Sequence, residues 1–285
     1  MAILYIDKPK GLTSFDICFK LRKVLGTKKI GHTGTLDPNA TGLMIILSDK
    51  DSKANQFLVS DNKEYIATCL LGIETDTLDI DGKVINTKEE TMPDKEEIKN
   101  VLSSFLGESY QIPPMTSAIK KNGKKLYEYQ REGIEVEIEP RKINIEEIEL
   151  LDINDKTFSF RCKVSSGTYI RSLLKDILTK LNVIGTLSEL RRTKINDIDV
   201  SKADKLEDVL EGRYTCQNLY DLLIKRYKEY VVSDPKDILN GKRLYLKSNE
   251  NELLITYNKQ CLAIYVKEKN YYVSKRGLFW LIYFM

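Results

Sequence analysis

Strand-length apolar runs dominate this chain, and they do not alternate regularly with helical patterns. Residues 42–47 and 65–71 are nearly continuous apolar runs, which predict buried strands, and further strands are predicted at 3–6, 142–151 and 157–164. A parallel sheet covered by helices requires a regular succession of strand, helix and strand. The irregular order therefore favours an α+β fold with a mixed, largely antiparallel sheet.

Helical patterns are fewer and lie between the strands. The clearest amphipathic helix is predicted over residues 169–181, where apolar side chains recur every three or four positions. Further helices are predicted over 93–107 and, shorter, over 126–132. Another begins after Thr13 or Ser14, because either hydroxyl can cap the first turn of a helix.

The composition shifts near residues 233–235 to short β-rich runs separated by polar turns. We therefore expect two domains: residues 1–232, and a small β-rich domain over 233–285. A domain of about fifty residues has marginal stability by itself.

The composition also limits the chemistry available to the chain. With 42% hydrophobic residues and a net charge of +3, the chain is expected to be globular rather than disordered. The five scattered cysteines form no C-x-x-C pair, and neither a signal peptide nor a membrane span is visible, so we expect a cytoplasmic protein without membrane association.

His32 is the only histidine, which excludes zinc sites of the Cys/His type and His-based triads. Catalysis would have to use carboxylates, hydroxyls, amines or a bound cofactor.

The most informative segment is residues 31–42, with the sequence GHTGTLDPNATG. Its three glycines allow the backbone to approach a ligand closely, and Asp37 is its only carboxylate. A glycine-rich turn with an ordinary Asp-Pro bend is the alternative interpretation. The segment contains neither of the glycine-rich signatures of nucleotide-binding loops.

This segment resembles the catalytic motif of the TruB family of tRNA pseudouridine synthases, G-H-T-G-T-L-D-P-x-A-T-G. Other segments resemble the remaining motifs of the family in the same order along the chain: residues 8–14, 64–65, 72–82, 112–118, 124–129, 166–171 and 190–192. The resemblance is strong up to about residue 195 and weak in the tail. It implies a catalytic domain of the pseudouridine synthase type, a tRNA-gripping insertion at about 108–140, and a PUA-like RNA-binding C-terminal domain.

The resemblance implies that Asp37 is the catalytic residue. Isomerising uridine to pseudouridine breaks the N1–C1′ bond and forms a C5–C1′ bond, which needs a carboxylate near the glycosidic carbon but no metal or redox cofactor. We therefore expect no cofactor. Arg171, at the start of a predicted helix, could pair with Asp37 and keep it ionised; a solvated surface ion pair is the alternative.

The same family pattern implies roles for four further residues. Tyr65 stacks on the target base, Tyr169 lines the pocket, and Leu190 forms an apolar wall. His32 enters the T loop of the tRNA and fills the space that the flipped base vacates. Taken without the resemblance, each of these residues could be an ordinary packing or surface residue.

Asp79, Lys8 and Lys120 complete the set of expected substrate-binding residues. The segment around Asp79 imitates a calcium-binding loop, but Lys88 occupies the position where a bidentate Glu is required, so no metal is expected. Family resemblance instead implies that Asp79 lies near the active site. Lys8 belongs to the N-terminal motif, and Lys120 to a group of lysines in the insertion that suits RNA phosphates.

The sequence therefore predicts a tRNA pseudouridine synthase that acts on the uridine at position 55 in the T loop. A guide-RNA-dependent rRNA pseudouridine synthase, as in the dyskerin relatives, is a second interpretation. A tRNA-folding chaperone is a third. No protein partner is evident.

Overall fold

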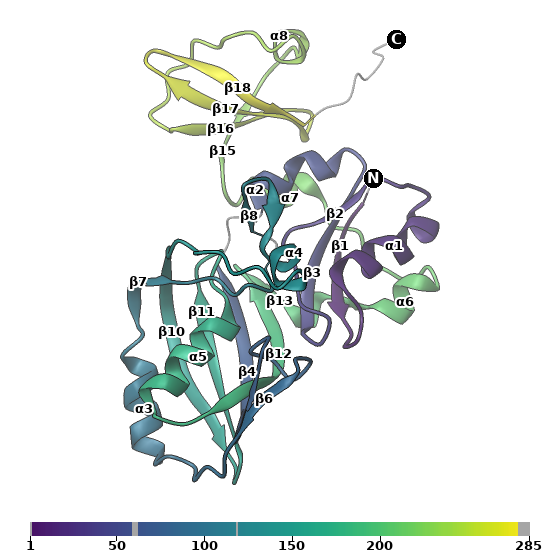
Figure 1. Cartoon of the computed structure of the whole chain (residues 1–285). Helices are drawn as coiled ribbons and strands as arrows, with labels where there is room; N and C mark the ends of the chain where they lie inside the picture. The colour runs from purple at the N-terminus through teal and green to yellow at the C-terminus, as the bar shows by residue number, and fades with distance from the viewer. Residues whose placement is uncertain (1, 59–61, 118, 279–285) are drawn as a thin grey trace.

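The structure is a computed structural model that describes residues 2–58, 62–117 and 119–278 (Figure 1). Its largest element is a ten-stranded sheet in the order β14-β1-β3-β12-β4-β11-β10-β7, with β2 beside β3 and β13 beside β12. The strands are β1 (Ile3–Lys8), β2 (Ile30–His32), β3 (Thr41–Ser48), β4 (Lys63–Leu71), β7 (Gly107–Gln111), β10 (Arg141–Ile153), β11 (Thr157–Val164), β12 (Gly185–Ile195), β13 (Ile198–Asp199) and β14 (Asp204–Lys205). Strand pairing is parallel in β1/β14 and β3/β12 and antiparallel in the other pairs of this sheet, which confirms the predicted fold class.

Helices cover parts of this sheet and connect its strands. They are α1 (Ser14–Leu25), η1 (Asp51–Ala54), α2 (Asn55–Leu58), α3 (Lys95–Ser103), α4 (Leu126–Arg131), α5 (Ile170–Lys180), η2 (Val200–Lys202), α6 (Leu206–Leu210), α7 (Leu219–Leu223) and α8 (Lys236–Leu239). The expected cap of α1 is Thr13, which forms a capping box with Asp16. Helices α3 and α5 lie beside each other against the sheet (Figure 1). No helix in the described part of the chain is long and apolar enough to cross a membrane.

Strand β12 joins the two halves of the large sheet, and the sequence patterns did not predict it. It pairs with β4 on one side and with β3 on the other. Its sequence, GTLSELRRTKI, has few apolar residues and no clean alternation, because polar side chains of β12 are used on both faces. A strand of this kind gives no hydrophobic signal of its own.

The contact between β3 and β12 requires a glycine at position 42. Gly42 has φ +104°, and a Cβ atom there would lie 2.2 Å from the backbone oxygen of Arg192. The two strands are paired in parallel at this point, with Arg192 opposite Gly42. Gly42 therefore lets the end of the informative loop approach the central strand.

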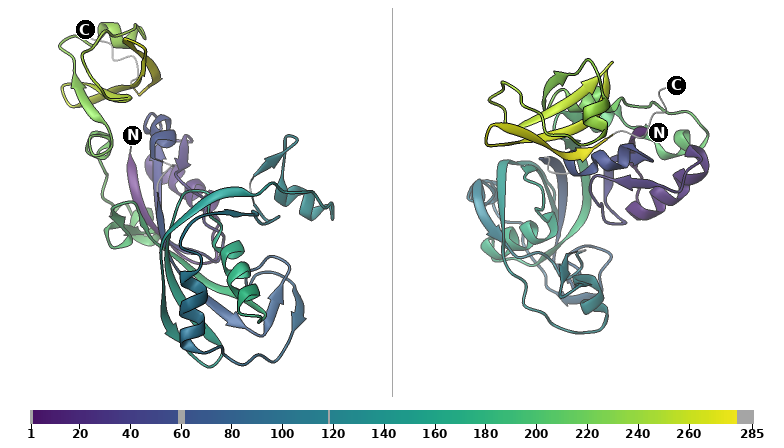
Figure 2. Two further views of the ribbon diagram at one scale, coloured as in Figure 1. Left: turned by 90° about the vertical axis from the view of Figure 1, so that its left-hand side faces the viewer. Right: turned by 90° about the horizontal axis from the view of Figure 1, so that it is seen from above.

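Two small hairpins extend from the sheet. One consists of β5 (Ile73–Thr75) and β6 (Val84–Thr87), and the other of β8 (Lys120–Lys121) and β9 (Lys124–Lys125). The second hairpin and α4 project from the body as an arm (Figure 2). Residues 108–111, which we assigned to the insertion, instead form β7 with Gly107, because they pair with β10. Residue 118 of the expected motif at 112–118 lies outside the described residues.

The C-terminal part contains a four-stranded sheet (Figures 1 and 2). Its strands are β15 (Lys228–Val231), β16 (Glu252–Tyr257), β17 (Gln260–Glu268) and β18 (Tyr271–Gly277). β15 is parallel to β16, and it begins before residue 233, so the β-rich part starts earlier than the composition indicates. The reason is that β15 is short and mostly exposed and carries little apolar signal. Residues 279–285 of the expected domain lie outside the described residues.

One face of this C-terminal sheet contributes to a buried cluster that also contains residues of α2, α7 and the large sheet. Leu254 and Ile264 share a buried cluster with Ile3, Tyr5 and Leu43 of β1 and β3. The other face forms a core within the C-terminal part. A small sheet that buries both faces gains more apolar contact than it could by itself, which offsets its small size.

Replacing Gly42 with Ala should destabilise the protein by about 3 kcal/mol or more, because the new methyl group would overlap the Arg192 backbone and the positive φ would strain any side chain. Urea unfolding followed by circular dichroism measures this effect. Gly26→Ala is the matched control: Gly26 also has positive φ but nothing within 4 Å of its Cβ position, so about 1 kcal/mol is expected. Equal losses in the two variants would show that the close approach at Gly42 is unimportant.

Candidate active site

A pocket of about 410 Å³ opens where the informative loop meets the central strands. Five of the expected site residues line it, from four separate parts of the chain: Asp37, Tyr65, Tyr169, Arg171 and Leu190. Asp37 lies on the loop, Tyr65 on β4, Leu190 on β12, and the other two at the start of α5. The sheet thus brings together residues that are far apart in the sequence.

Arg171 links two carboxylates at the edge of this pocket. Its Nη2 atom lies 3.1 Å from Oδ2 of Asp37, and its Nη1 atom lies 3.4 Å from Oδ2 of Asp79. Arg171 also donates to the carbonyl of Thr77 at 3.1 Å and to the hydroxyl of Thr116. With its side chain only 6% exposed, the guanidinium is held in one orientation, and the solvated surface ion pair is excluded.

The protonation of Asp37 reflects opposing influences. Burial raises its pKa above the ordinary aspartate value, and the charge of Arg171 opposes that rise. The neighbouring carboxylate of Asp79 raises the pKa, and the more distant ammonium of Lys8 lowers it. Asp37 still exposes 37% of its side chain, on the side that faces the pocket, so its carboxylate is accessible to a ligand.

The loop around Asp37 is held by side chains from other elements. Ser14 at the start of α1 binds Leu36 twice, accepting from its N–H at 2.8 Å and donating to its carbonyl at 3.0 Å. Arg192 donates from Nη2 to the carbonyl of Gly34 at 3.1 Å. These bonds satisfy backbone groups that have no strand partner.

Lys8 serves the same loop, which corrects its expected place as a substrate contact. Its side chain is completely buried. Its Nζ atom donates to the carbonyls of Pro9, Pro38 and Ala40 at 3.0, 2.9 and 2.6 Å. Burial lowers the pKa of Lys8 to about 8, although the charge of Asp37 opposes this shift. All three donors of the ammonium are used within the protein, so Lys8 supports the loop rather than reaching RNA.

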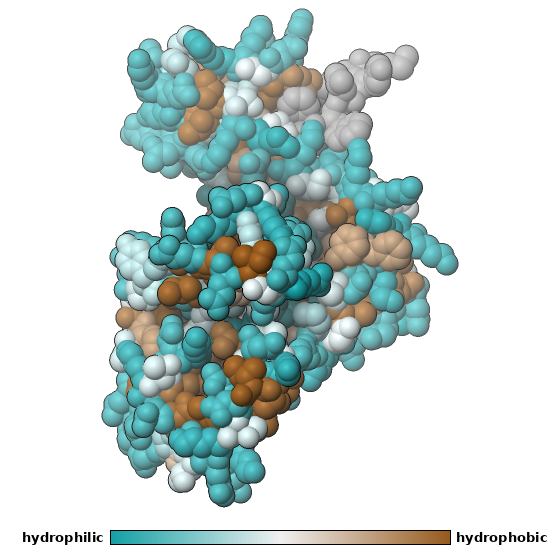
Figure 3. Space-filling view, in the orientation of Figure 1, coloured by the Kyte–Doolittle hydropathy of each residue, from teal (hydrophilic) through white to brown (hydrophobic). Residues whose placement is uncertain are grey.

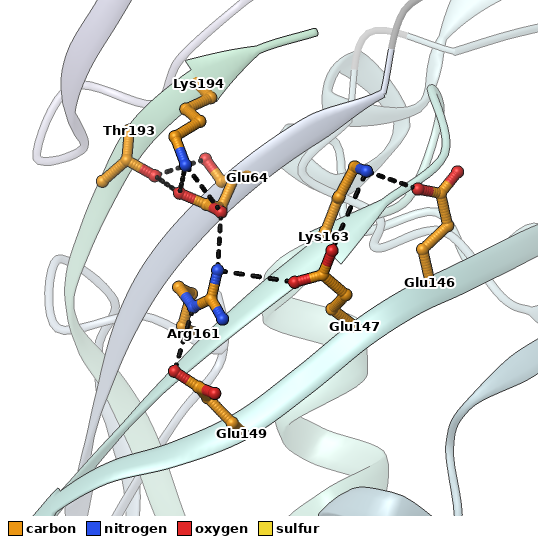
Figure 4. A network of polar contacts seen from close by, with 8 residues as sticks. All are labelled: Glu64, Glu146, Glu147, Glu149, Arg161, Lys163, Thr193 and Lys194. Atoms are coloured by element: carbon orange, nitrogen blue, oxygen red, sulfur yellow. Dashed lines mark hydrogen bonds and ion pairs between the residues drawn. The ribbon is translucent and has the colours of Figure 1, made fainter. Parts of the chain in front are cut away.

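A network of charges surrounds Glu64, the residue that precedes Tyr65 on β4 (Figure 4). Glu64 is 7% exposed and accepts hydrogen bonds from Arg161 at 2.9 Å and from Thr193 at 2.8 Å. Lys194 lies 3.4 Å from the same carboxylate. Burial alone would raise the pKa of Glu64, but the hydrogen bonds from Thr193 and Arg161 outweigh it and lower the pKa. The network joins β4 to both neighbouring strands directly behind Tyr65.

Tyr169 and Leu190 lie on different sides of the pocket. The backbone of Tyr169 is fixed by the side-chain amide of Gln111, which accepts from its N–H at 2.8 Å and donates to its carbonyl at 3.1 Å. Burial raises the pKa of both tyrosine hydroxyls in the pocket, Tyr65 and Tyr169, so both are protonated at neutral pH. Leu190 contributes an apolar surface between the main pocket and a smaller one that contains Asp37 and Asp79.

His32 and Lys120 lie outside this pocket. His32 ends β2 and is half-buried, with no hydrogen-bond partner for Nδ1 among the described residues. Burial lowers its pKa, with the charge of Arg192 as a second cause, so the imidazole is neutral at neutral pH. Lys120 is exposed on the β8–β9 hairpin of the arm. Both residues could contact only a part of a ligand that extends outside the pocket.

Sequence reasoning missed several residues that line the pocket. They include Thr33, Lys63, Thr116, Tyr127 and Arg192. Thr33, Thr116, Tyr127 and Arg192 lie within segments that resemble family motifs, so the resemblance offered a signal for these four. Nothing in the hydrophobic pattern indicates that Lys63 is buried beside the loop at residues 31–42.

The potential metal ligands are also dispersed. Within residues 2–58, 62–117 and 119–278, no group of three or more His, Cys, Asp or Glu side chains could hold a metal ion. The two carboxylates nearest the pocket, Asp37 and Asp79, share Arg171 instead.

The chain is similar to proteins of known family. Residues 22–170, more than half of the chain, match the family model described as TruB family pseudouridylate synthase (N terminal domain). A Lactobacillus acidophilus protein named tRNA pseudouridine synthase B is 37% identical over 283 residues, which cover 95% of this chain and 95% of that protein. A protein of the same name from Aquifex aeolicus is 41% identical over 258 residues, covering 88% of this chain and 90% of the relative.

Solved structures show the same fold. The structure described as "Crystal Structure of a Cbf5-Nop10-Gar1 Complex" matches with a TM-score of 0.73 at 23% identity, over 98% of this chain and 85% of that one. Together, the sheet, the loop and the pocket define a pseudouridylate synthase. The chain belongs to the TruB family, as the segment at residues 31–42 predicts.

Replacing Arg171 with Met should raise the pKa of Asp37 further, because it removes the positive charge that opposes the effect of burial. A carbon-13 NMR titration, with the Asp37 carboxyl signal assigned by its absence in Asp37→Asn, measures this. Arg213→Met, which breaks an exposed pair with Asp208, is the control and should leave the titration unchanged. An Asp37 pKa that stays the same or falls in Arg171→Met would contradict the electrostatic role of Arg171.

Proposed function

We propose that the protein isomerises uridine to pseudouridine in tRNA, and that its target is the uridine at position 55 in the T loop. The observation that carries the proposal is the carboxylate of Asp37, held against the buried guanidinium of Arg171 in a pocket walled by Tyr65 and Leu190. Membership of the TruB family supports the reaction, and the names of the relatives support tRNA as the substrate.

In this proposal, the target uridine leaves the RNA stack and enters the pocket. Tyr65 stacks on the flipped base and Leu190 closes the apolar side, while Tyr169 lines the remaining wall. Asp37, paired with Arg171, acts at the sugar–base bond as the N1–C1′ bond breaks and the C5–C1′ bond forms. Since the product is an isomer of the substrate, no atom or electron has to enter from a cofactor.

The proposal assigns RNA contacts to residues outside the pocket. Lys120 and its neighbours on the arm would contact tRNA phosphates, and the neutral His32 would fill the space left by the flipped base. Asp79 would contact RNA near the pocket while sharing Arg171 with Asp37. Local rather than overall positive charge suffices, because affinity for phosphate comes from the cations that touch it.

We also propose a domain division in which a catalytic domain precedes a small β-rich, PUA-like RNA-binding domain. Four strands of the C-terminal sheet, including β15, would belong to the second domain. The free cysteines of the described residues fit a reducing compartment, so we place the protein in the cytoplasm.

A guide-RNA-dependent rRNA pseudouridine synthase, the second interpretation of the sequence, is the second candidate. Purified chain and an unmodified tRNA transcript, without other RNA or protein, distinguish the two. Chemical mapping should find pseudouridine at position 55 alone. Conversion that requires an added guide RNA, or that occurs only at other positions, would contradict the proposed target.

Asp37→Asn should abolish pseudouridine formation, because the amide loses the nucleophilic oxygen, while tRNA affinity stays within about tenfold because phosphate contacts dominate binding. Single-turnover kinetics and filter binding measure the two quantities. Asp208→Asn, at an exposed side chain of α6, is the control and should behave like the wild type. Turnover near the wild-type rate in Asp37→Asn would remove Asp37 from the mechanism.

A further inference from the structure

A second buried arginine lines the pocket, and no catalytic role has been given to it. Arg192, on β12, is 1% exposed. Its Nε atom donates to the carbonyl of Leu43 at 2.7 Å, and its Nη2 atom donates to the carbonyl of Gly34 at 3.1 Å. One guanidinium therefore binds both the first part of β3 and the loop that carries Asp37.

The same guanidinium interacts with Tyr65. Arg192 and Tyr65 are direct cross-strand partners on β12 and β4, so their side chains lie on the same face of the sheet. Hydrogen bonding and positive charge from Arg192 oppose the burial that raises the pKa of Tyr65. The hydroxyl of Tyr65 is thus the third oxygen that this guanidinium contacts.

Arg192 lacks the partner that buried arginines usually have. Across the described part of the chain, no carboxylate lies within ion-pairing distance of Arg192, whereas Arg171 has two and Arg191 pairs with Asp7 at 2.7 Å. Burying a charge without a counter-ion is unfavourable unless its hydrogen bonds are well satisfied. For Arg192 those bonds go to the carbonyl of Leu43 and to two groups that line the pocket, the carbonyl of Gly34 and the phenol of Tyr65.

We propose that Arg192 is a positioning residue, which fixes the ring of Tyr65 and the loop of Asp37 in one relative arrangement. This inference rests on the proposed function. The planar guanidinium presents its donors in a rigid fork, so three oxygens on β3, β4 and the loop are held at set angles. A shift of the reacting carboxylate relative to the stacked base would lower the rate without changing most contacts to RNA.

Other possible roles of Arg192 make different predictions for variants at this position. A lysine could retain the charge but not the fork, because a single ammonium on a flexible chain cannot hold three oxygens in one plane. A phosphate-binding arginine would lose affinity and change its salt dependence when altered. A purely structural arginine would lose stability but keep the rate of the molecules that remain folded.

The test is a double-mutant cycle of Arg192→Lys and Tyr65→Phe, with Arg192→Met as a stronger variant. Single-turnover rates at saturating enzyme, tRNA dissociation constants at two salt concentrations, and thermal unfolding are measured for each. Arg226→Lys is the matched control, since Arg226 also donates to a backbone carbonyl, that of Phe57 at 3.0 Å, but lies away from the pocket. It should keep the wild-type rate.

We expect Arg192→Lys to lower the single-turnover rate by about 30-fold in the wild-type background, with the dissociation constant changed less than about threefold. In the Tyr65→Phe background the same change should cost only about threefold, since the shared contact is already lost. Equal rate losses in both backgrounds would overturn the inference, as would weakened binding with a normal rate or lower stability with a normal rate.

If Arg192→Met does not fold, Arg192→Lys and Tyr65→Phe still complete the cycle. An inactive wild-type protein would refute the proposed function itself. A wild-type protein that forms pseudouridine, together with an Arg192→Lys variant as fast as Arg226→Lys, would refute only the role of Arg192.

Discussion

The loop around Asp37 depends on backbone hydrogen bonds to side chains from elsewhere in the domain. A segment outside any strand ladder must find other partners for its buried polar groups. Lys8 on β1, Ser14 on α1 and Arg192 on β12 supply them. The position of Asp37 is consequently set by three elements at once, and the loop cannot shift unless one of them shifts with it.

Strand β12 makes different polar contacts on the two faces of the sheet. A register shift between Arg192 and Lys194 lets Arg192 stay opposite Tyr65 while Thr193 and Lys194 both reach Glu64 on the other face. Tyr65 is therefore supported by a guanidinium beside it and a charge network behind it. In the proposed function, where Tyr65 stacks on the target base, support on both faces of its strand would keep the ring in one orientation.

The sequence predicts the parts of this structure that have a strong local signal. The buried runs at 42–47 and 65–71 form β3 and β4, the helix at 169–181 forms α5, and the motif at 31–42 leads to the family. Strand β12 could not be predicted, because its residues satisfy polar partners on both faces. The burial of Lys8 could not be predicted either, since it depends on carbonyls about thirty residues away, which only the fold brings near.

Two buried arginines contribute to one pocket in different ways. Arg171 is neutralised locally by Asp37 and Asp79, so its main effect is to orient a carboxylate and oppose the rise in its pKa. Arg192 has only oxygen dipoles as partners, so its positive charge remains uncompensated and adds to burial, the larger cause, in lowering the pKa of His32. Removing Arg171 would leave the two carboxylates without a counter-ion, and removing Arg192 would leave the loop without its fork of donors. The pocket therefore needs both arginines, each at its own position.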